Sequence, residues 1–181
     1  MTQDVHVALL RGINLGGRNR LSMKDLSFMF SDAGCASVAT YIQSGNVVFQ
    51  APPAIARRIP DLIEKAISKT FGYQVPVVMR TGGELRKIVR GNPFLRAGAE
   101  EATLHVAFLA TRPAAARVKV LDPDRSPPDA FAVRGREIYL HCPKGYGRSK
   151  LTNAYFDSKL ATFSTVRNWR TVMTLLELAY G

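Results

Sequence analysis

The residues best suited to chemistry lie at positions 141–150, in the run His-Cys-Pro-Lys-Gly-Tyr-Gly-Arg-Ser-Lys. The run combines two glycines, which let a backbone approach a ligand closely, with three cations, Lys144, Arg148 and Lys150. A strand-like run precedes it, and a helix-like run expected at 149–161 follows it. Because a helix N-terminus offers unpaired N–H groups to an anion, this spacing predicts a binding site for phosphate.

A strand end further along the chain is expected to lie next to this basic loop, since the two segments share one end of a split βαβ sheet. There Arg167 adds a cation, and Tyr146 and Trp169 add rings of the kind that stack on nucleotides or single-stranded nucleic acid. Ser149 and Asn168 equally fit plain helix caps, and Trp169 fits a buried helix face. The candidate ligand-binding residues of this cluster are Lys144, Gly145, Gly147, Arg148, Ser149, Lys150, Asn153, Arg167 and Asn168.

A second polar, glycine-rich cluster is expected in the first half of the chain. Residues 11–20 follow a strand-like run, and residues 43–46 form the turn of a hairpin-like run. The same topology brings these two loops to one end of a sheet, where cations and amides would surround a ligand. The candidates in this cluster are Arg11, Asn14, Gly16, Gly17, Gln43, Ser44 and Asn46.

No catalytic or metal-binding arrangement emerges from the sequence. His6, His105 and His141 each lie in a strand-like run, where a lone histidine is typical of packing. Cys35 and Cys142 are far apart and lack metal or disulfide spacing, which favours a reducing cytoplasm. Neither a P-loop nor a dinucleotide-binding glycine motif is present. The residues therefore predict no metal and no cofactor, and they assign no reaction.

Composition favours an anionic partner. The 181 residues carry a formal net charge of +11, and 46% of them are hydrophobic, which suffices for a buried core. No apolar run reaches the length of a membrane span, and no signal peptide precedes the first apolar run. We expect a soluble cytoplasmic protein without a membrane partner, whose oligomeric state the sequence leaves open.

The chain also repeats itself, in three pairs of similar segments that occur in the same order. Each half reads β-α-β-β-α-β-α, which is the ferredoxin-like order with an extra helix. The sequence thus predicts an α+β fold of two tandem ferredoxin-like halves that arose by internal duplication, at 1–91 and 102–181, joined by a linker at 92–101. The paired segments are 6–10 with 105–109, 41–49 with 131–139, and 78–81 with 165–168.

Capping residues and apolar spacing locate the helices between these segments. A proline-rich stretch at 122–129 is expected to be an exposed connection. The first expected helix starts at Ser22, the second covers 55–71 with a break or a start at Pro60, and the third runs from Thr81 to about Arg90. Three more are expected at 113–121, 149–161 and 168–180.

With these residues identified, the chain resembles the bacterial domain-of-unknown-function family 1697 over nearly its whole length. The resemblance implies a duplicated α+β, plait-like fold, and it implies no activity. Arg170 adds one cation to the pattern. The segments that carry the resemblance are 10–17, 40–49, 92–94, 147–153 and 167–171.

Three functions remain open at this point. The first is a phosphate-recognising protein that binds RNA or single-stranded DNA through its glycine-rich basic loops. The second is an enzyme acting on a nucleotide or another small phosphorylated substrate, although no general base is evident. The third is an interaction module whose basic loops dock an acidic protein partner.

Overall fold

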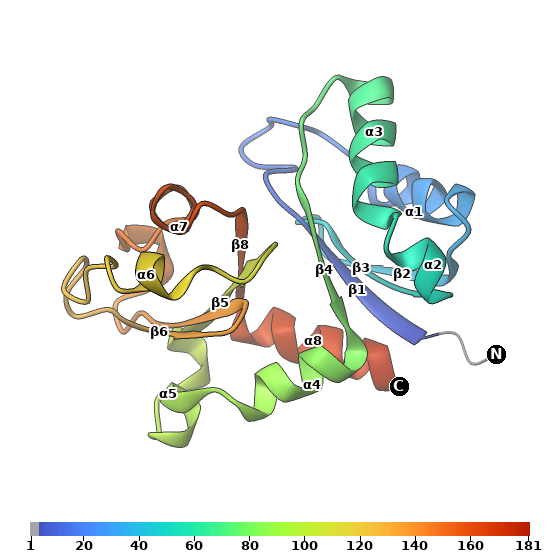
Figure 1. Cartoon of the computed structure of the whole chain (residues 1–181). Helices are drawn as coiled ribbons and strands as arrows, with labels where there is room; N and C mark the ends of the chain where they lie inside the picture. Colours follow the sequence, from blue (N-terminus) through green and yellow to red (C-terminus); the bar gives the residue numbers. More distant parts are fainter. Residues whose placement is uncertain (1–3) are drawn as a thin grey trace. The chain divides into compact units, whose positions relative to one another are not determined.

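The computed structural model describes residues 4–181 as a mixed α+β structure with two four-stranded antiparallel sheets (Figure 1). The chain divides into two compact units. One unit extends to Arg86 and includes Leu175–Gly181, and the other consists of Lys87–Thr174. Each unit contains one of the two sheets.

The first unit has the strand order β2-β3-β1-β4, with every neighbouring pair antiparallel. Its strands are β1 (Asp4–Leu10), β2 (Ala36–Tyr41), β3 (Asn46–Ala51) and β4 (Val77–Thr81), and its helices are α1 (Met23–Asp32), α2 (Pro53–Ala56), α3 (Ile59–Phe71) and the first part of α4 (Gly82–Arg90).

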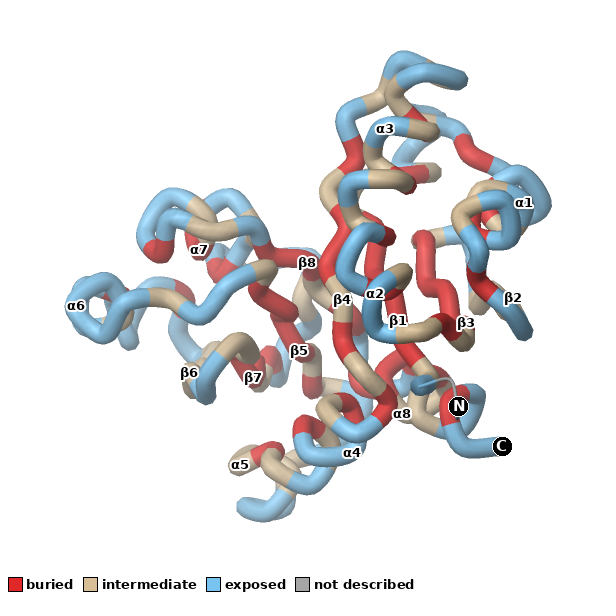
Figure 2. Tube along the Cα trace, turned by 45° about the vertical axis from the view of Figure 1, so that its right-hand side comes forward, coloured by how far each residue is buried: buried red, intermediate tan, exposed pale blue. Residues whose placement is uncertain are grey.

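Helices α1 and α3 cover one face of this sheet, because each presents an apolar stripe at helical spacing. Ile59, Ile63 and Ile67 of α3 are fully buried in one core with Leu26 and Phe30 of α1. Figure 2 shows this burial running along the central strands while the outer turns of the helices stay exposed. The core therefore fixes the sheet end from which the first predicted loop cluster extends.

The second unit has the strand order β6-β7-β5-β8, again antiparallel throughout. Its strands are β5 (Leu104–Leu109), β6 (Ala130–Arg134), β7 (Glu137–His141) and β8 (Ser164–Asn168). Its helices are α5 (Pro93–Arg96), α6 (Ala115–Val118), α7 (Asn153–Leu160) and the first half of α8 (Trp169–Tyr180), with 3-10 turns η1 (Glu101–Thr103) and η2 (Tyr146–Arg148).

Strand register supports two of the three sequence repeats at single-residue level. His6 lies opposite Thr81 in the first sheet, and His105 lies opposite Asn168 in the second, as the paired segments predict. The alignment of 41–49 with 131–139 is wrong by one residue in its second strand, since Ala8 pairs with Val47 and Ala107 pairs with Ile138. This alignment fails because the turns of the two hairpins differ in length.

The first hairpin leaves four residues between Tyr41 and Asn46, and the second leaves two between Arg134 and Glu137. An alignment without gaps therefore cannot match both strands of the two hairpins. In contrast, the segments 78–81 and 165–168 align without correction, because each lies entirely within one strand.

Several expected helix boundaries are confirmed. The hydroxyl of Ser22 caps α1, and Pro60 lies in the first turn of α3. Thr81 and Glu84 form a reciprocal capping box at α4: the Glu84 N–H donates to Thr81 Oγ1, and the Thr81 N–H donates to Glu84 Oε2.

Two expectations about helices need correction. The helix expected at 113–121 is only the single turn α6, because few of its residues, Val118 and Leu121, pack on the core. The helix expected at 149–161 begins at Asn153, where Thr152 rather than Ser149 supplies the cap. Residues 92–101, the segment proposed as a linker, contain the short helix α5, which Asn92 caps.

Candidate functional site

The first predicted loop cluster forms, and Asn14 holds it together. Asn14 Nδ2 donates to the carbonyl oxygens of Leu21 at 2.8 Å and Gln43 at 2.7 Å. Its Oδ1 accepts from the Leu21 N–H at 2.9 Å. The backbone of Asn14 lies in the left-handed region at φ 53°, which asparagine tolerates better than most residues. Asn14 thus acts first as a scaffold that joins the 11–20 loop to the 42–45 turn.

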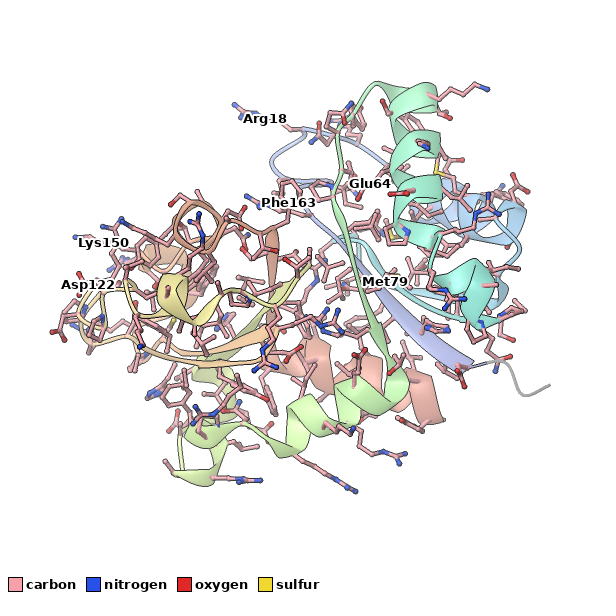
Figure 3. All side chains as sticks on the ribbon, viewed as in Figure 1. Arg18, Glu64, Met79, Asp122, Lys150 and Phe163 are labelled. Atoms are coloured by element: carbon pink, nitrogen blue, oxygen red, sulfur yellow. The ribbon has the colours of Figure 1, made fainter. Side chains whose placement is uncertain are left out.

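Gly16 and Gly17 form the two central residues of a tight turn closed by Leu15 and Arg18. Both glycines have positive φ, 54° and 80°, as the mirror-image hairpin turn requires. A Cβ on Gly17 would meet the guanidinium of Arg20 at 3.7 Å, so this guanidinium lies over the Gly17 backbone. Arg18 extends outward from the same loop (Figure 3).

The facing turn is strained at one position. Ile42 has φ 50°, which is a rare conformation for a β-branched residue, and its side chain is 49% exposed. The backbone of Gly45 lies so close to Leu10 that a Cβ on Gly45 would be 2.7 Å from Leu10 Cβ. Asn46 is buried and donates to the Tyr41 carbonyl and to Ser44 Oγ. Ser44 and Asn46 therefore stabilise the turn from within.

An open pocket of about 530 Å³ lies between these loops, α1 and the end of α3. Three predicted residues line it, namely Asn14, Gly17 and Gln43. The sequence does not identify Leu21, Ser22, Asp25 and Phe71 as site residues, and it places Arg20 in the cluster without predicting a ligand contact for it. The pocket lining is Asn14, Gly17, Arg20, Leu21, Ser22, Asp25, Gln43 and Phe71.

The missed residues differ in how they could have been found. Arg20 is the last residue of the predicted loop 11–20, and Ser22 and Asp25 follow directly after it, so a loop extended by five residues includes them all. Phe71 ends a helix that starts far along the chain, and its apolar character alone indicates only core packing. Arg11 is half-buried directly after β1, and it does not line this pocket.

The basic loop of the second unit exposes its cations. Lys144, Arg148 and Lys150 are all exposed, and the loop contains the 3-10 turn η2 rather than a helix start. Added Cβ atoms on Gly145 and Gly147 would meet nothing within 4 Å, so the space around both glycines is open. Within residues 4–181, no ion pair of these three cations with a carboxylate is recorded. Their charges face solvent.

Two contacts hold this loop in place. The Tyr146 ring stacks on His105 of β5, with ring centroids 5.0 Å apart. The Lys150 N–H donates to Ser126 Oγ at 3.0 Å, and this hydroxyl donates to Asp129. The proline-rich segment 122–129 is therefore held against the basic loop through Ser126 and Asp129. Figure 3 labels Asp122 and Lys150 on the same side of the unit.

The strand ends meet as predicted, but the side chains do not gather in one cluster. His141 and Asn168 both pair with the start of β5, opposite Leu104 and His105. Arg167 pairs with Val106, and neighbouring strand residues point to opposite faces, so Arg167 lies on the face away from His105 and Tyr146. Arg167 is thus separated from the three loop cations.

The remaining candidates of this cluster have structural partners. Asn168 Oδ1 accepts from the Thr171 N–H and caps α8. Asn153 Oδ1 accepts from Ser164 Oγ, which ties α7 to β8. Ser149 Oγ accepts from the Leu151 N–H. Trp169 is buried, as one of its two interpretations predicts, and so offers no stacking surface.

Burial shifts several ionisable groups of this unit. Burial lowers the pKa of Arg167 to about 10, and its guanidinium donates to Thr165 Oγ1 and the Val166 carbonyl. Burial also lowers the pKa of His105, which a hydrogen bond with the Thr103 backbone partly opposes. These shifts arise from packing, and Arg167 stays cationic at neutral pH.

The described residues 4–181 contain no group of three or more histidine, cysteine or acidic side chains placed to hold a metal. Over the same range, no helix combines the length and the apolar character that crossing a bilayer demands.

Comparison with solved structures finds the same fold in a bacterial protein. The conserved protein SP0830 from Streptococcus pneumoniae is 17% identical, with a TM-score of 0.74, and the match covers 98% of this chain and 99% of that one. Identity this low shows the shared fold alone. No curated protein matches the sequence.

A family described as a protein of unknown function, DUF1697, matches residues 3–139. The matched range contains the segments 10–17, 40–49 and 92–94, and it ends before the basic loop and the segment 167–171. The expected resemblance over nearly the whole length thus narrows to about three quarters of the sequence. Because the match covers more than half of the chain, this protein belongs to the DUF1697 family of proteins of unknown function.

Proposed function

We propose that this protein binds a phosphate-bearing polymer, RNA or single-stranded DNA, through the basic loop 144–150. The observation that carries the proposal is the exposure of Lys144, Arg148 and Lys150 on one anchored loop with open space around its two glycines. Cations without a carboxylate partner are available to neutralise phosphates and release counterions.

The net charge of +11 supports the same conclusion, since it attracts polyanions over a distance. The buried Trp169 and the stacked Tyr146 argue against base stacking at this loop. We therefore expect binding through the phosphate backbone, with little sequence preference and a strong dependence on salt.

Fluorescence anisotropy of a labelled single-stranded RNA, measured over a series of salt concentrations, tests this function. Replacing Lys144, Arg148 and Lys150 with glutamine should weaken the salt dependence of binding. The magnitude of the slope of log K against log salt should fall by about 2, at about 0.7 per lost phosphate contact. A matched variant replaces Arg57, Lys65 and Lys69, three exposed cations on or beside α2 and α3, and should change the slope little. Equal losses in both variants, or no binding at low salt, would contradict the proposal.

A second candidate function is recognition of a small phosphorylated molecule, and the pocket of the first unit favours it. A volume of about 530 Å³ suits a metabolite, and the guanidinium of Arg20 supplies an anion contact beside Gly17. The second function predicts that Arg20→Gln weakens binding of inorganic phosphate, as measured by isothermal titration calorimetry. Lys144→Gln should leave that binding unchanged.

We infer further that the two units are ferredoxin-like and arose by duplication. The repeated strand order and the equivalent registers of His6 and His105 support this inference. We propose that the two halves are 1–91 and 102–181 and that 92–101 links them. As a separate point, we propose that the protein is cytoplasmic. Superposition of the two sheets over their eight strands tests the duplication, with matching traces and right-handed crossovers as the expected result.

A further inference from the structure

We propose that the pocket of the first unit binds a nucleoside phosphate whose base offers a hydrogen-bond donor edge, as guanine does. The inference rests on the second candidate function, the recognition of a small phosphorylated molecule by this pocket. It adds a role for Asp25 and Phe71, two residues that phosphate recognition alone does not need.

The first argument is the charge of the pocket lining. Arg20 and Asp25 line the same pocket, and among the residues that the structure describes they form no ion pair with one another. A ligand that carries an anion and a separate donor edge satisfies both side chains at once. An ionised carboxylate accepts two hydrogen bonds side by side, which matches the two adjacent N–H donors of guanine.

The second argument is that the Asp25 carboxylate is available for this contact. The backbone N–H of Asp25 donates to the capping hydroxyl of Ser22 at 3.0 Å, which holds the residue in the first turn of α1. The residue is exposed, and no hydrogen bond of its carboxylate is recorded within residues 4–181. Phe71 is half-buried in the same lining and stacks one face of its ring on Tyr73, with ring centroids 5.9 Å apart. Its second ring face is where we place a planar base.

The third argument is the rigidity of the pocket wall. Asn14 bonds to both loops that form the wall, so Gln43 and Gly17 are held in fixed relation. Ile42, next to Gln43, keeps a left-handed backbone conformation at φ 50°, which is unfavourable for a β-branched residue. Backbone strain of this kind is common at binding sites, where the surrounding structure keeps the strained residue in place.

The experiment is calorimetric titration of the full-length protein with inorganic phosphate, adenosine monophosphate and guanosine monophosphate. We expect the guanine nucleotide to bind about tenfold more tightly than the adenine nucleotide, because adenine lacks the paired donors. Asp25→Asn should remove this preference, and because it takes a negative charge out of the pocket it should not weaken phosphate binding. Arg20→Gln should weaken all three ligands.

The outcomes separate this inference from the function on which it rests. Equal binding of the two nucleotides, or a guanine preference that survives in Asp25→Asn, overturns the base recognition while Arg20-dependent phosphate binding stands. Absence of binding by all three ligands overturns both. Circular dichroism of each variant shows whether it is folded, and Asp25→Glu, which retains the carboxylate, should keep part of the preference.

Discussion

The side-chain amide of Asn14 donates a hydrogen bond of 2.7 Å to the carbonyl oxygen of Gln43, which lies 29 residues away in the sequence. The same side chain bonds twice to Leu21. One asparagine therefore satisfies backbone groups from two loops, and the pocket wall behaves as one piece.

Replacement of Asn14 should destabilise the first unit strongly. Asn14→Ala removes three hydrogen bonds and places alanine in the left-handed region, for an expected loss of about 2–4 kcal/mol in the free energy of unfolding. Urea denaturation measures the loss. Asn14→Gly removes the same bonds without the backbone strain and should be the milder change, so an equal or larger loss in the glycine variant would contradict the role of φ.

Ile42 should be replaceable with a gain in stability. Asparagine accepts the left-handed conformation more readily than a β-branched residue, and Ile42 is half exposed, so little packing is lost. Ile42→Asn should stabilise the protein by about 0.5–1 kcal/mol in urea denaturation. The matched variant Ile42→Val keeps the branched Cβ and should give no gain; destabilisation by Ile42→Asn would show that the side chain matters for packing.

His105 should make stability depend on pH. Burial lowers its pKa below the usual 6.5, so the unfolded chain binds a proton at a higher pH than the folded protein does. The stabilising contribution is therefore present above pH 6.5 and declines as pH falls from there toward the folded pKa. Unfolding midpoints measured across this range should decrease as the pH is lowered. His105→Gln should flatten that part of the pH profile.

Neither cysteine should react in the native protein. Burial raises the pKa of Cys35 to about 11, and burial together with the charge of Asp129 raises that of Cys142 to about 11, against a hydrogen bond with Ser149. Because the thiolate is the reactive form, a disulfide-exchange reagent at mildly alkaline pH should label neither thiol until denaturant is added. Rapid labelling of the folded protein would indicate local opening near one of them.

Much of the fold follows from local sequence. A helix begins at Thr81 as expected, where Thr81 and Glu84 form a capping box, and Pro60 lies in the first turn of another helix, because caps and prolines act on their nearest neighbours. The start of α7 could not be read in the same way. Ser149 and Thr152 are both capping residues, and the choice of Thr152 depends on how Leu151 is buried in the core.

The candidate site shows the same division. Loop 11–20 and turn 43–46 were expected to meet, since topology brings their strand ends together, and Asn14 does reach Gln43. Arg167 was expected with the loop cations, but the alternation of side chains along β8 puts it on the other face. Phe71 was not expected in the site, since only the packing of α3 brings its end to the pocket.

The sequence by itself determined the element types, the turn glycines, most helix caps, the repeated order of the two halves and the excess of positive charge, because each depends on residues close in the chain or on composition. Only the tertiary structure decided which polar side chains support loops and which face a ligand. Asn14 and Gln43, or Lys150 and Ser126, meet across long stretches of sequence. Such contacts arise from sheet register and core packing, which no local pattern encodes.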